Sequence, residues 1–343
     1  MDCRMSSGPE IFFDCIDKAF VILKNNFHPN KYPDIKIYND LKNSIIQRFN
    51  VDELEDNIFL GHGSFNIAER IIHKLLTPGL LLGVGPQFNE IPSEFQSAGG
   101  KLVFISRFNN FSNIVDSVIK KVDFLNPTVI YIDRPNNPTG WVMPIKDIHK
   151  LAILCHKRNI LLFIDEAFGD FIDDSESIIH LIKQYNNIAV IRSFSKGFGL
   201  ASFRVGYGIF SNNIAPYIKN IFPPFEPSLY STNVALCANN VFFRLNDVRR
   251  DVKKYKEKIY TKLSAIGLYW YNTHDAVPLI VIHDHLKEKN LFQYFMKYGI
   301  LAEPLSSYKI TYPSANNHSI KLSLPFDEYN RSKLLSLLDK MKI

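Results

Sequence analysis

The stretch IRSFSKGFGLASFRVGYG, residues 191–208, sets one lysine in a loop between two apolar segments. The apolar run before the loop predicts the end of a buried strand, and a second strand is expected after Arg204. A lone lysine at a strand end is usually a solvated surface residue. Here, however, Ser193, Ser195 and Arg204 bracket Lys196, and all three are phosphate-binding types. Because a neighbouring cation can lower the pKa of a lysine and make its amine a nucleophile, this loop suits an aldehyde cofactor that carries a phosphate.

Two further motifs stand upstream of this loop, RPNNPTG from Arg134 and DEAFGDF from Asp165. With SFSKGFGLASFRVG they resemble, in the same order, the motifs of the fold-type-I pyridoxal-phosphate (PLP) enzymes, the class I and II aminotransferases. Within that family the sequence is most similar to the branch that holds histidinol-phosphate aminotransferase and threonine-phosphate decarboxylase. The resemblance runs from about Gly8 to the C-terminus. Any one motif is weak evidence, and the three together are a specific signal.

The composition excludes several classes of protein. The 343 residues are 46% hydrophobic and 22% charged with a net charge of +6, as in an ordinary globular protein. The basic residues are scattered, so no nucleic-acid partner is expected, and a small anionic molecule fits the charge equally well. The four cysteines lack CxxC or paired spacing, which predicts neither a metal site nor a disulfide framework. With no signal peptide and no apolar run near the ~20 residues of a membrane span, we expect a cytoplasmic protein without membrane association.

The apolar pattern predicts an α/β fold. Short apolar runs, most of them separated by stretches long enough for a helix, indicate a mostly parallel seven-stranded sheet with helices on both faces. The family that the sequence resembles also has a seven-stranded sheet. Ligands of such sheets gather at the carboxyl ends of the strands, where Asp165, Ser193 and Lys196 fall. The expected strands lie near residues 58–60, 80–84, 102–105, 129–132, 161–164, 189–191 and 204–210.

The flanking segments predict a second, smaller α+β domain. Amphipathic helices are expected at both ends of the chain, and residues 229–266 are expected to form one long or one broken helix that links the domains. The predicted division is residues 1–34 with the small domain, 35–228 as the large PLP-binding domain, and 229–343 as the interdomain helix and small domain. The other expected elements are helices over 9–25, 38–49, 291–298 and 327–341, a turn at ILAEPL, and strands at VPLIVIH and SIKLSLP.

The resemblance gives Lys196 the central catalytic role. Its amine would form a Schiff base with the cofactor aldehyde and then move a proton at the substrate α-carbon. Asp165 ends the apolar run ILLFID, where a buried carboxylate without a partner would be costly. The resemblance supplies that partner, the protonated pyridine nitrogen of the cofactor. The alternative is a helix N-cap or a metal ligand together with Glu166, although neighbouring strand residues point to opposite faces.

The cofactor phosphate is expected at the loop around Lys196. Ser193, Ser195 and the fork-shaped guanidinium of Arg204 are the predicted ligands. Ser64 and Phe65 stand in LGHGSFNIAERII, which predicts a strand, a glycine turn and a helix whose first N–H groups point at an anion. By resemblance both residues donate to the phosphate. No GxGxxG follows a strand, so a dinucleotide site is not predicted.

Three aromatic or amide residues complete the expected cofactor site. Asn137, which taken alone marks only a turn, would by resemblance donate to the ring hydroxyl oxygen. Phe88 in GPQFNE matches the aromatic residue that stacks on the ring, with a place in the hydrophobic core as the alternative. Tyr32 in KYPD matches a tyrosine that reaches the phosphate of the partner subunit, which predicts a homodimer.

The motifs depart from the family at the substrate side. Phe168 stands where most of these aminotransferases have tyrosine, and threonine-phosphate decarboxylases share its DEAF motif. Lys321 in SIKLSLP replaces an arginine that holds a substrate anion, and it keeps the charge without the fork. Arg134 is our hypothesis for a substitute. These three residues are the expected substrate contacts, and only SSGPE remains of the N-terminal arm that usually covers the substrate.

The sequence therefore predicts a homodimeric PLP-dependent aminotransferase. It would transfer an amino group between an amino acid or amino-phosphate compound and a keto acid. The first alternative is a PLP-dependent decarboxylase of a phosphorylated amino acid, such as phosphothreonine or phosphoserine, which the DEAF motif favours. The second is an inactive relative that serves as a binding or scaffold subunit. The complete set of Lys196, Asp165, Asn137 and Arg204 argues against it.

Overall fold

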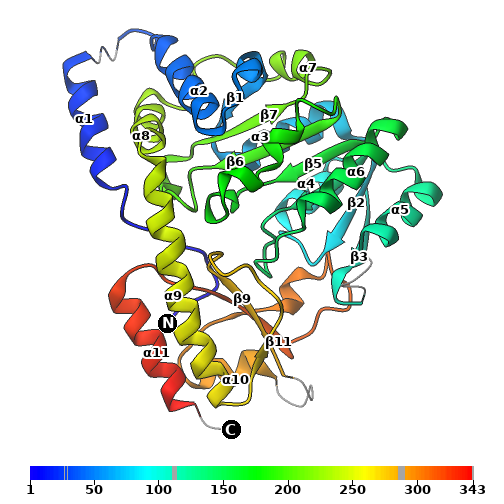
Figure 1. The fold of residues 1–343 in the computed structure, drawn as a ribbon, viewed down its shortest axis with the longest axis vertical. Helices are drawn as coiled ribbons and strands as arrows, with labels where there is room; N and C mark the ends of the chain where they lie inside the picture. The colour runs from blue at the N-terminus through cyan, green and yellow to red at the C-terminus, as the bar shows by residue number, and fades with distance from the viewer. Residues whose placement is uncertain (27, 29, 110–113, 285–289, 342–343) are drawn as a thin grey trace.

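The computed structural model describes residues 1–26, 28, 30–109, 114–284 and 290–341. Its centre is a seven-stranded sheet with the order β1-β7-β6-β5-β4-β2-β3 (Figure 1). Strand β7 runs antiparallel to β1 and β6, and the pairs from β6 to β3 are parallel. This confirms the predicted mostly parallel sheet. The strands are β1 (Ile58–Gly61), β2 (Leu80–Gly85), β3 (Lys101–Ser106), β4 (Val129–Asp133), β5 (Leu161–Asp165), β6 (Ile188–Ser193) and β7 (Gly206–Phe210).

Helices cover both faces of this sheet because its strands are apolar on both sides. Ile130 and Leu162 belong to one hydrophobic core, and their neighbours Val129 and Phe163 belong to the core on the opposite face. The first core includes side chains of α2 (Lys36–Phe49), α5 (Ile114–Leu125), α6 (Ile145–Arg158) and α8 (Leu229–Asn239). The second includes side chains of α3 (Gly63–Ile71), α4 (Glu90–Ser97) and α7 (Ala215–Lys219).

A smaller antiparallel sheet with its own core follows, in the order β10-β11-β9-β8. The predicted helix over 229–266 is broken, because α8 ends at Asn239 and the next α-helix, α9, begins at Leu245. The ILAEPL segment, expected to be a turn, contributes the two-residue strand β10. The elements are β8 (Tyr269–Trp270), β9 (Leu279–His283), β10 (Glu303–Pro304), β11 (Ser319–Ser323), α9 (Leu245–Ala265), α10 (Leu291–Lys297) and α11 (Glu328–Lys340).

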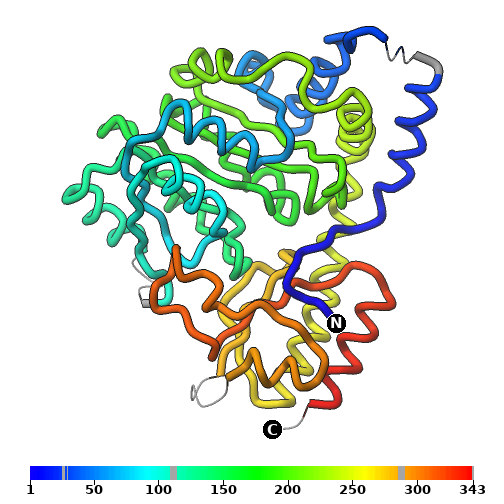
Figure 2. Tube along the Cα trace, turned by 180° about the vertical axis from the view of Figure 1, so that it is seen from behind, coloured from blue at the N-terminus to red at the C-terminus, as the bar shows by residue number. Residues whose placement is uncertain are grey.

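The N-terminal segment joins the two cores. Cys3 is buried in the core of the smaller sheet, whereas Cys15 and Ala19 of α1 (Asp14–Asn26) are buried in the larger one. Figure 2 shows this segment rising from the smaller sheet toward the larger. The helix starts later than the predicted residue 9. The division of the chain at 34/35 and 228/229 stays a prediction.

Two further expectations concern the cysteines and the membrane. All four cysteines are free, which agrees with the prediction of no disulfide framework. In the part of the chain that the structure describes, every helix is too short or too polar to cross a bilayer. The cytoplasmic setting stays a prediction.

A cluster of buried charges lies beneath the end of β6. Arg192 donates to Glu166 Oε2 and to Asp170 Oδ1, both at 2.9 Å. Arg48 of α2 also donates to Asp170 Oδ1, at 2.8 Å. These side chains are almost fully buried, so each charge depends on its partners for stability. The cluster therefore ties α2 and the segment after β5 to the strand that leads into the Lys196 loop.

We predict that Arg192→Met lowers the free energy of unfolding by about 3–5 kcal/mol, because it leaves Glu166 and Asp170 with fewer cationic partners in the interior. Denaturant titration of the purified protein measures this change. Arg158→Met is the matched control, since the ion pair of Arg158 with Asp123 is exposed, and it should cost only about 0–1 kcal/mol. Equal losses in the two variants would contradict a stabilising role of the cluster.

Candidate active site

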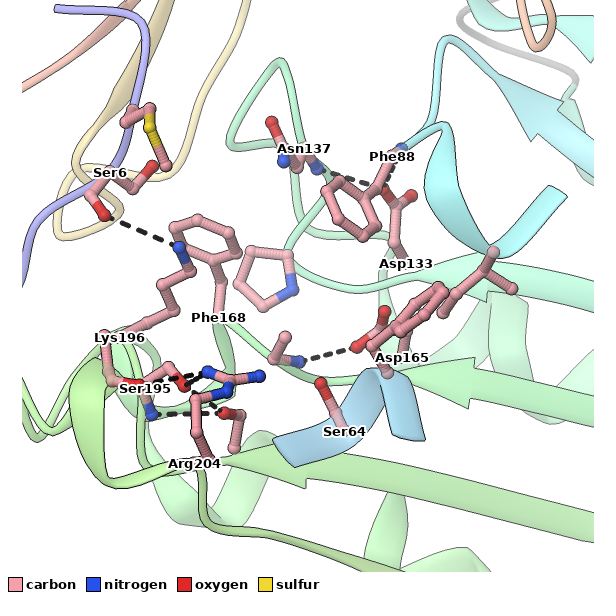
Figure 3. Close-up of a pocket in the computed structure, with 17 residues that line it drawn as sticks. Ser6, Ser64, Phe88, Asp133, Asn137, Asp165, Phe168, Ser195, Lys196 and Arg204 are labelled. Carbon is pink, nitrogen blue, oxygen red and sulfur yellow. Dashed lines mark hydrogen bonds between the residues drawn. The ribbon is translucent and has the colours of Figure 1, made fainter. Parts of the chain in front are cut away.

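A cavity of about 300 Å³ opens at the carboxyl ends of β4, β5 and β6 (Figure 3). This is the edge where parallel strands present the side chains that follow them. Most of the residues predicted from the sequence line it. They are Ser64, Phe65, Phe88, Asn137, Asp165, Phe168, Ser193, Ser195, Lys196 and Arg204.

Lys196 extends into the cavity from the loop after β6. Its Nζ donates a long hydrogen bond of 3.5 Å to the carbonyl oxygen of Ser6 and lies 5.5 Å from the centre of the Phe168 ring. Burial lowers the pKa of the lysine, the positive charges of Lys321 and Arg204 lower it further, and Asp165 opposes them. The effect of Arg204 expected from the sequence is present, but burial is the larger cause. The amine therefore loses its proton more readily than that of an exposed lysine.

One end of the cavity is built to hold an anion. Ser193 Oγ donates to Ser195 Oγ at 2.8 Å, and Arg204 Nη1 donates to the same oxygen at 3.4 Å. The first turn of α3, with Ser64, lies at this end (Figure 3). Gly63 has a φ of +83°, and a Cβ on it would lie 2.7 Å from Arg204 Nη2, so glycine is required for this approach. Two hydroxyls, a guanidinium and a helix N-terminus make a phosphate-binding arrangement.

Asp165 lies in the floor of the cavity, away from the anion end. Its Oδ1 accepts from the N–H of Ala167 at 2.9 Å and its Oδ2 from the hydroxyl of Tyr131 at 3.2 Å. Burial raises its pKa to about 6, so the charged form calls for a cationic partner. Glu166 points to the other face, where it pairs with Arg192. This excludes the alternative in which the two carboxylates share a metal ion.

Sequence reasoning missed seven residues of the cavity wall, which are Met5, Ser6, Ile91, Asp133, Pro135, Ala167 and Ala201. Asp133 ends β4 beside Asp165, its register partner in β5. The signal was available, because VIYID ends in a carboxylate as ILLFID does. Met5 and Ser6 also line the cavity. Their approach depends on Gly8, where a Cβ would lie 2.4 Å from the Cα of Gly199 in the Lys196 loop.

Arg134 does not reach the cavity. Its side chain is fully buried and donates to the carbonyl oxygens of Met143 at 2.7 Å and Glu176 at 2.8 Å. The hypothesis that it binds the substrate does not fit this geometry. Arg134 directly follows β4, whose last residue Asp133 lines the cavity, and its own side chain is turned into the interior. We correct the role of Arg134 to bracing the segments that follow β4 and β5.

Lys321 and Tyr32 also lie outside the cavity lining. Lys321 is buried in β11, where it pairs with Glu303 and donates to the hydroxyl of Tyr308 at 3.1 Å. The same hydroxyl has Glu303 Oε2 at 3.0 Å as its nearer acceptor and Asn137 Oδ1 at 3.4 Å, so Lys321 is connected to the cavity through Tyr308. Tyr32 is 86% exposed. Its ring stacks on Phe225 with the centroids 5.3 Å apart.

The chain is similar to known proteins in both sequence and fold. The family model for aminotransferase class I and II matches residues 18–329. Histidinol-phosphate aminotransferase of Ruminiclostridium cellulolyticum is 30% identical over 282 residues, covering 81% of this chain and 76% of that protein. The structure of histidinol-phosphate aminotransferase from Sinorhizobium meliloti in complex with pyridoxal-5'-phosphate has a TM-score of 0.80 at 19% identity, covering 99% of this chain and 90% of that one. L-threonine-O-3-phosphate decarboxylase from Porphyromonas gingivalis has a TM-score of 0.75 at 15% identity, covering 99% and 98%.

We predict that burial of Asp165 makes the cofactor-free protein more stable in mild acid. The pKa of about 6 in the folded chain lies above the unfolded value of 3.8, so the folded state binds the proton more tightly. This contribution is complete below the unfolded pKa and is lost as the pH rises through the folded one. Between pH 8 and pH 5 the wild type should gain about 1 kcal/mol relative to Asp165→Asn.

Denaturant titrations of both cofactor-free proteins across this range measure the difference. The comparison with Asp165→Asn cancels the titration of groups that the two chains share. If the difference in the free energy of unfolding between the two proteins stays constant from pH 8 to pH 5, the carboxyl group of Asp165 keeps an ordinary pKa.

Proposed function

This chain belongs to the class I and II aminotransferase family, and from that premise we propose that it is a PLP-dependent aminotransferase. The amino group would pass between an amino acid or amino-phosphate compound and a keto acid. One observation carries the proposal. A single lysine of lowered pKa shares a cavity with an anion site on one side and a buried carboxylate on the other.

The donor set of the cavity fits pyridoxal phosphate. The hydroxyl of Ser195, the guanidinium of Arg204 and the N-terminus of α3 suit the phosphate group. Asp165, whose charged form is costly in the interior, suits the protonated pyridine nitrogen. Lys196 is the amine available to the aldehyde, and Phe88 in the cavity wall offers an aromatic face to the ring.

The chemistry divides between the cofactor and these side chains. When bound, the cofactor supplies the electron sink that lets a proton leave the substrate α-carbon. The Lys196 amine, neutral more often than that of an exposed lysine, would hold the cofactor aldehyde and, once displaced by the substrate amine, would be free to carry the α-proton. Asp165 would keep the pyridine nitrogen protonated. Met5 and Ser6 line the cavity from the side of the N-terminal segment.

Phe168 supports a second function, decarboxylation of a phosphorylated amino acid. Its ring lies in the cavity wall near Lys196 and presents no hydroxyl to the cofactor oxygen. The solved threonine-phosphate decarboxylase has the same fold. The two functions use the same cofactor residues and differ in which bond at the α-carbon is cleaved.

The proposal includes a homodimer. Tyr32 is exposed and lies outside the cavity of its own chain. The role at a phosphate that the resemblance implies for Tyr32 therefore requires a second copy of this chain.

We predict that the wild type, loaded with pyridoxal phosphate, is yellow and loses its colour with one class of amino donor while a keto product forms. Phosphothreonine, phosphoserine, histidinol phosphate and glutamate are the donors to compare. Lys196→Ala should lower kcat by about 10²–10⁴-fold or more, because the proton carrier at the α-carbon is lost. Absorption spectra and keto-acid assays measure both effects, and Lys150→Ala, which changes an exposed lysine, is the control.

Each result selects among the functions. Carbon dioxide release without keto product from the donor would replace the first function with the decarboxylase. A wild type that cannot be loaded with the cofactor would contradict both, and an unchanged kcat in Lys196→Ala would remove the lysine from its proposed role.

A further inference from the structure

Asp133 accepts hydrogen bonds from both sides of the cavity. The carboxylate is buried at the end of β4. Its Oδ2 accepts from the backbone N–H of Phe88 at 3.2 Å and from that of Asn137 at 3.0 Å. Its Oδ1 accepts from the side-chain amides of Asn136 at 2.7 Å and Gln87 at 3.3 Å. Four donors from two loops thus meet on one side chain.

The two backbone donors belong to residues whose side chains line the cavity. Phe88 comes from the loop after β2 and Asn137 from the loop after β4, so these loops are separate in the chain (Figure 3). Because one oxygen atom receives both N–H groups, the distance between the two residues is set by that atom. A site that must hold a flat ring needs this kind of support behind the residues that touch the ring.

The same loops have other anchors, which do not involve Asp133. The backbone N–H of Gln87 donates to Thr311 Oγ1 at 3.0 Å, and that hydroxyl donates to the carbonyl oxygen of Gln87 at 3.0 Å. Asn136 Nδ2 also donates to the carbonyl oxygen of Pro86 at 2.8 Å. Loss of the carboxylate therefore leaves the loops attached to the fold while it releases Phe88 and Asn137.

A stabilising role alone does not account for the carboxylate. Its four partners are neutral amides, and burial raises its pKa to about 7, so its charged form is costly in the folded chain. An apolar side chain would avoid that cost but would leave the four donors without an acceptor, and a neutral amide would offer one acceptor oxygen in place of two. The carboxylate is well suited, however, to receive donors on both oxygens at once.

We propose that Asp133 is a positioning residue for the cofactor ring. By accepting from their backbone N–H groups, Asp133 holds Phe88 at the face of the ring and Asn137 at its edge. It acts through these two residues and does not contact the reacting atoms. This inference rests on the proposed function, because it assigns the ring of pyridoxal phosphate to this cavity.

Two substitutions separate positioning from charge. Asp133→Ala removes every acceptor. Asp133→Asn keeps one oxygen, which can accept both backbone N–H groups, while its NH₂ takes the place of the Oδ1 that accepts from the Asn136 and Gln87 amides, so those two contacts must rearrange. Among the described residues Gln87 Oε1 is buried without a hydrogen-bond partner, so the Gln87 amide can turn and accept a hydrogen bond from the new NH₂ group. If position is what matters, the asparagine variant behaves like the wild type and the alanine variant does not.

The test is titration of the cofactor-free wild type and both variants with pyridoxal phosphate, followed by absorbance, by circular dichroism of the bound cofactor and by thermal unfolding. We expect Asp133→Ala to raise the dissociation constant by about 10-fold or more and to weaken the dichroism per bound cofactor. Asp133→Asn should stay within about 3-fold of the wild type. The thermal midpoints of the cofactor-free proteins should agree to within about 1 °C, which in a chain of this length is less than a lost structural contact usually costs.

The other outcomes overturn the inference. Equal weakening in both variants would assign the effect to the negative charge. Wild-type affinity in Asp133→Ala would remove the positioning role, and a large fall in its cofactor-free thermal midpoint would reduce Asp133 to a structural contact. If the wild type itself does not bind pyridoxal phosphate, the proposed function fails first and this inference fails with it.

Discussion

A carboxylate buried at the end of a hydrophobic strand is the constraint on which the rest of the site depends. Asp165 ends β5 in the interior of the large sheet, and its charge is costly there without a cationic partner. The parallel order of β4, β5 and β6 brings the NNPTG loop and the Lys196 loop to the same edge. The sheet therefore does more than support the helices: it gathers a carboxylate, an amine and an anion site around one small cavity, in the arrangement that a charged aromatic cofactor requires.

Much of the fold and of the cavity lining could be predicted because the relevant signals are local. Ser193, Ser195, Lys196 and Arg204 lie within one loop, and the strands of the large sheet are marked by short apolar runs. The errors arise where a role depends on direction or on distant partners. Arg134 was assigned to the substrate from its place in a motif, yet its side chain is turned into the interior, away from the cavity. The role of Asp133 is not visible in its own motif, because the groups that donate to its carboxylate come from two loops that are separate in the sequence.

The substrate side depends on contacts between distant segments. Lys321 of the smaller sheet pairs with Glu303 and donates to Tyr308, whose hydroxyl has Asn137 Oδ1 of the cavity as its farther acceptor. On another side, Ser6 accepts from Lys196, while Cys3 nearby belongs to the smaller core. A change in the position of the smaller sheet would thus act on the cavity along two routes. Neither route could be read from a motif, since each joins residues that are far apart in the sequence.

The antiparallel direction of β7 affects how the residues of such a site can vary in evolution. Because β7 pairs antiparallel with β6, the loop with Ser195, Lys196 and Arg204 is a connection between adjacent strands and forms one compact module. The N-terminal segment contributes Met5 and Ser6 to the other side of the cavity, and Lys321 of the smaller sheet lies behind that lining. Under the proposed function, substitutions at Met5 or around Lys321 could therefore alter the substrate without disturbing the loop that would hold the cofactor phosphate. Under the proposed function, the large sheet therefore carries the residues that hold the cofactor, whereas the residues that select a substrate can vary at the edge of the cavity.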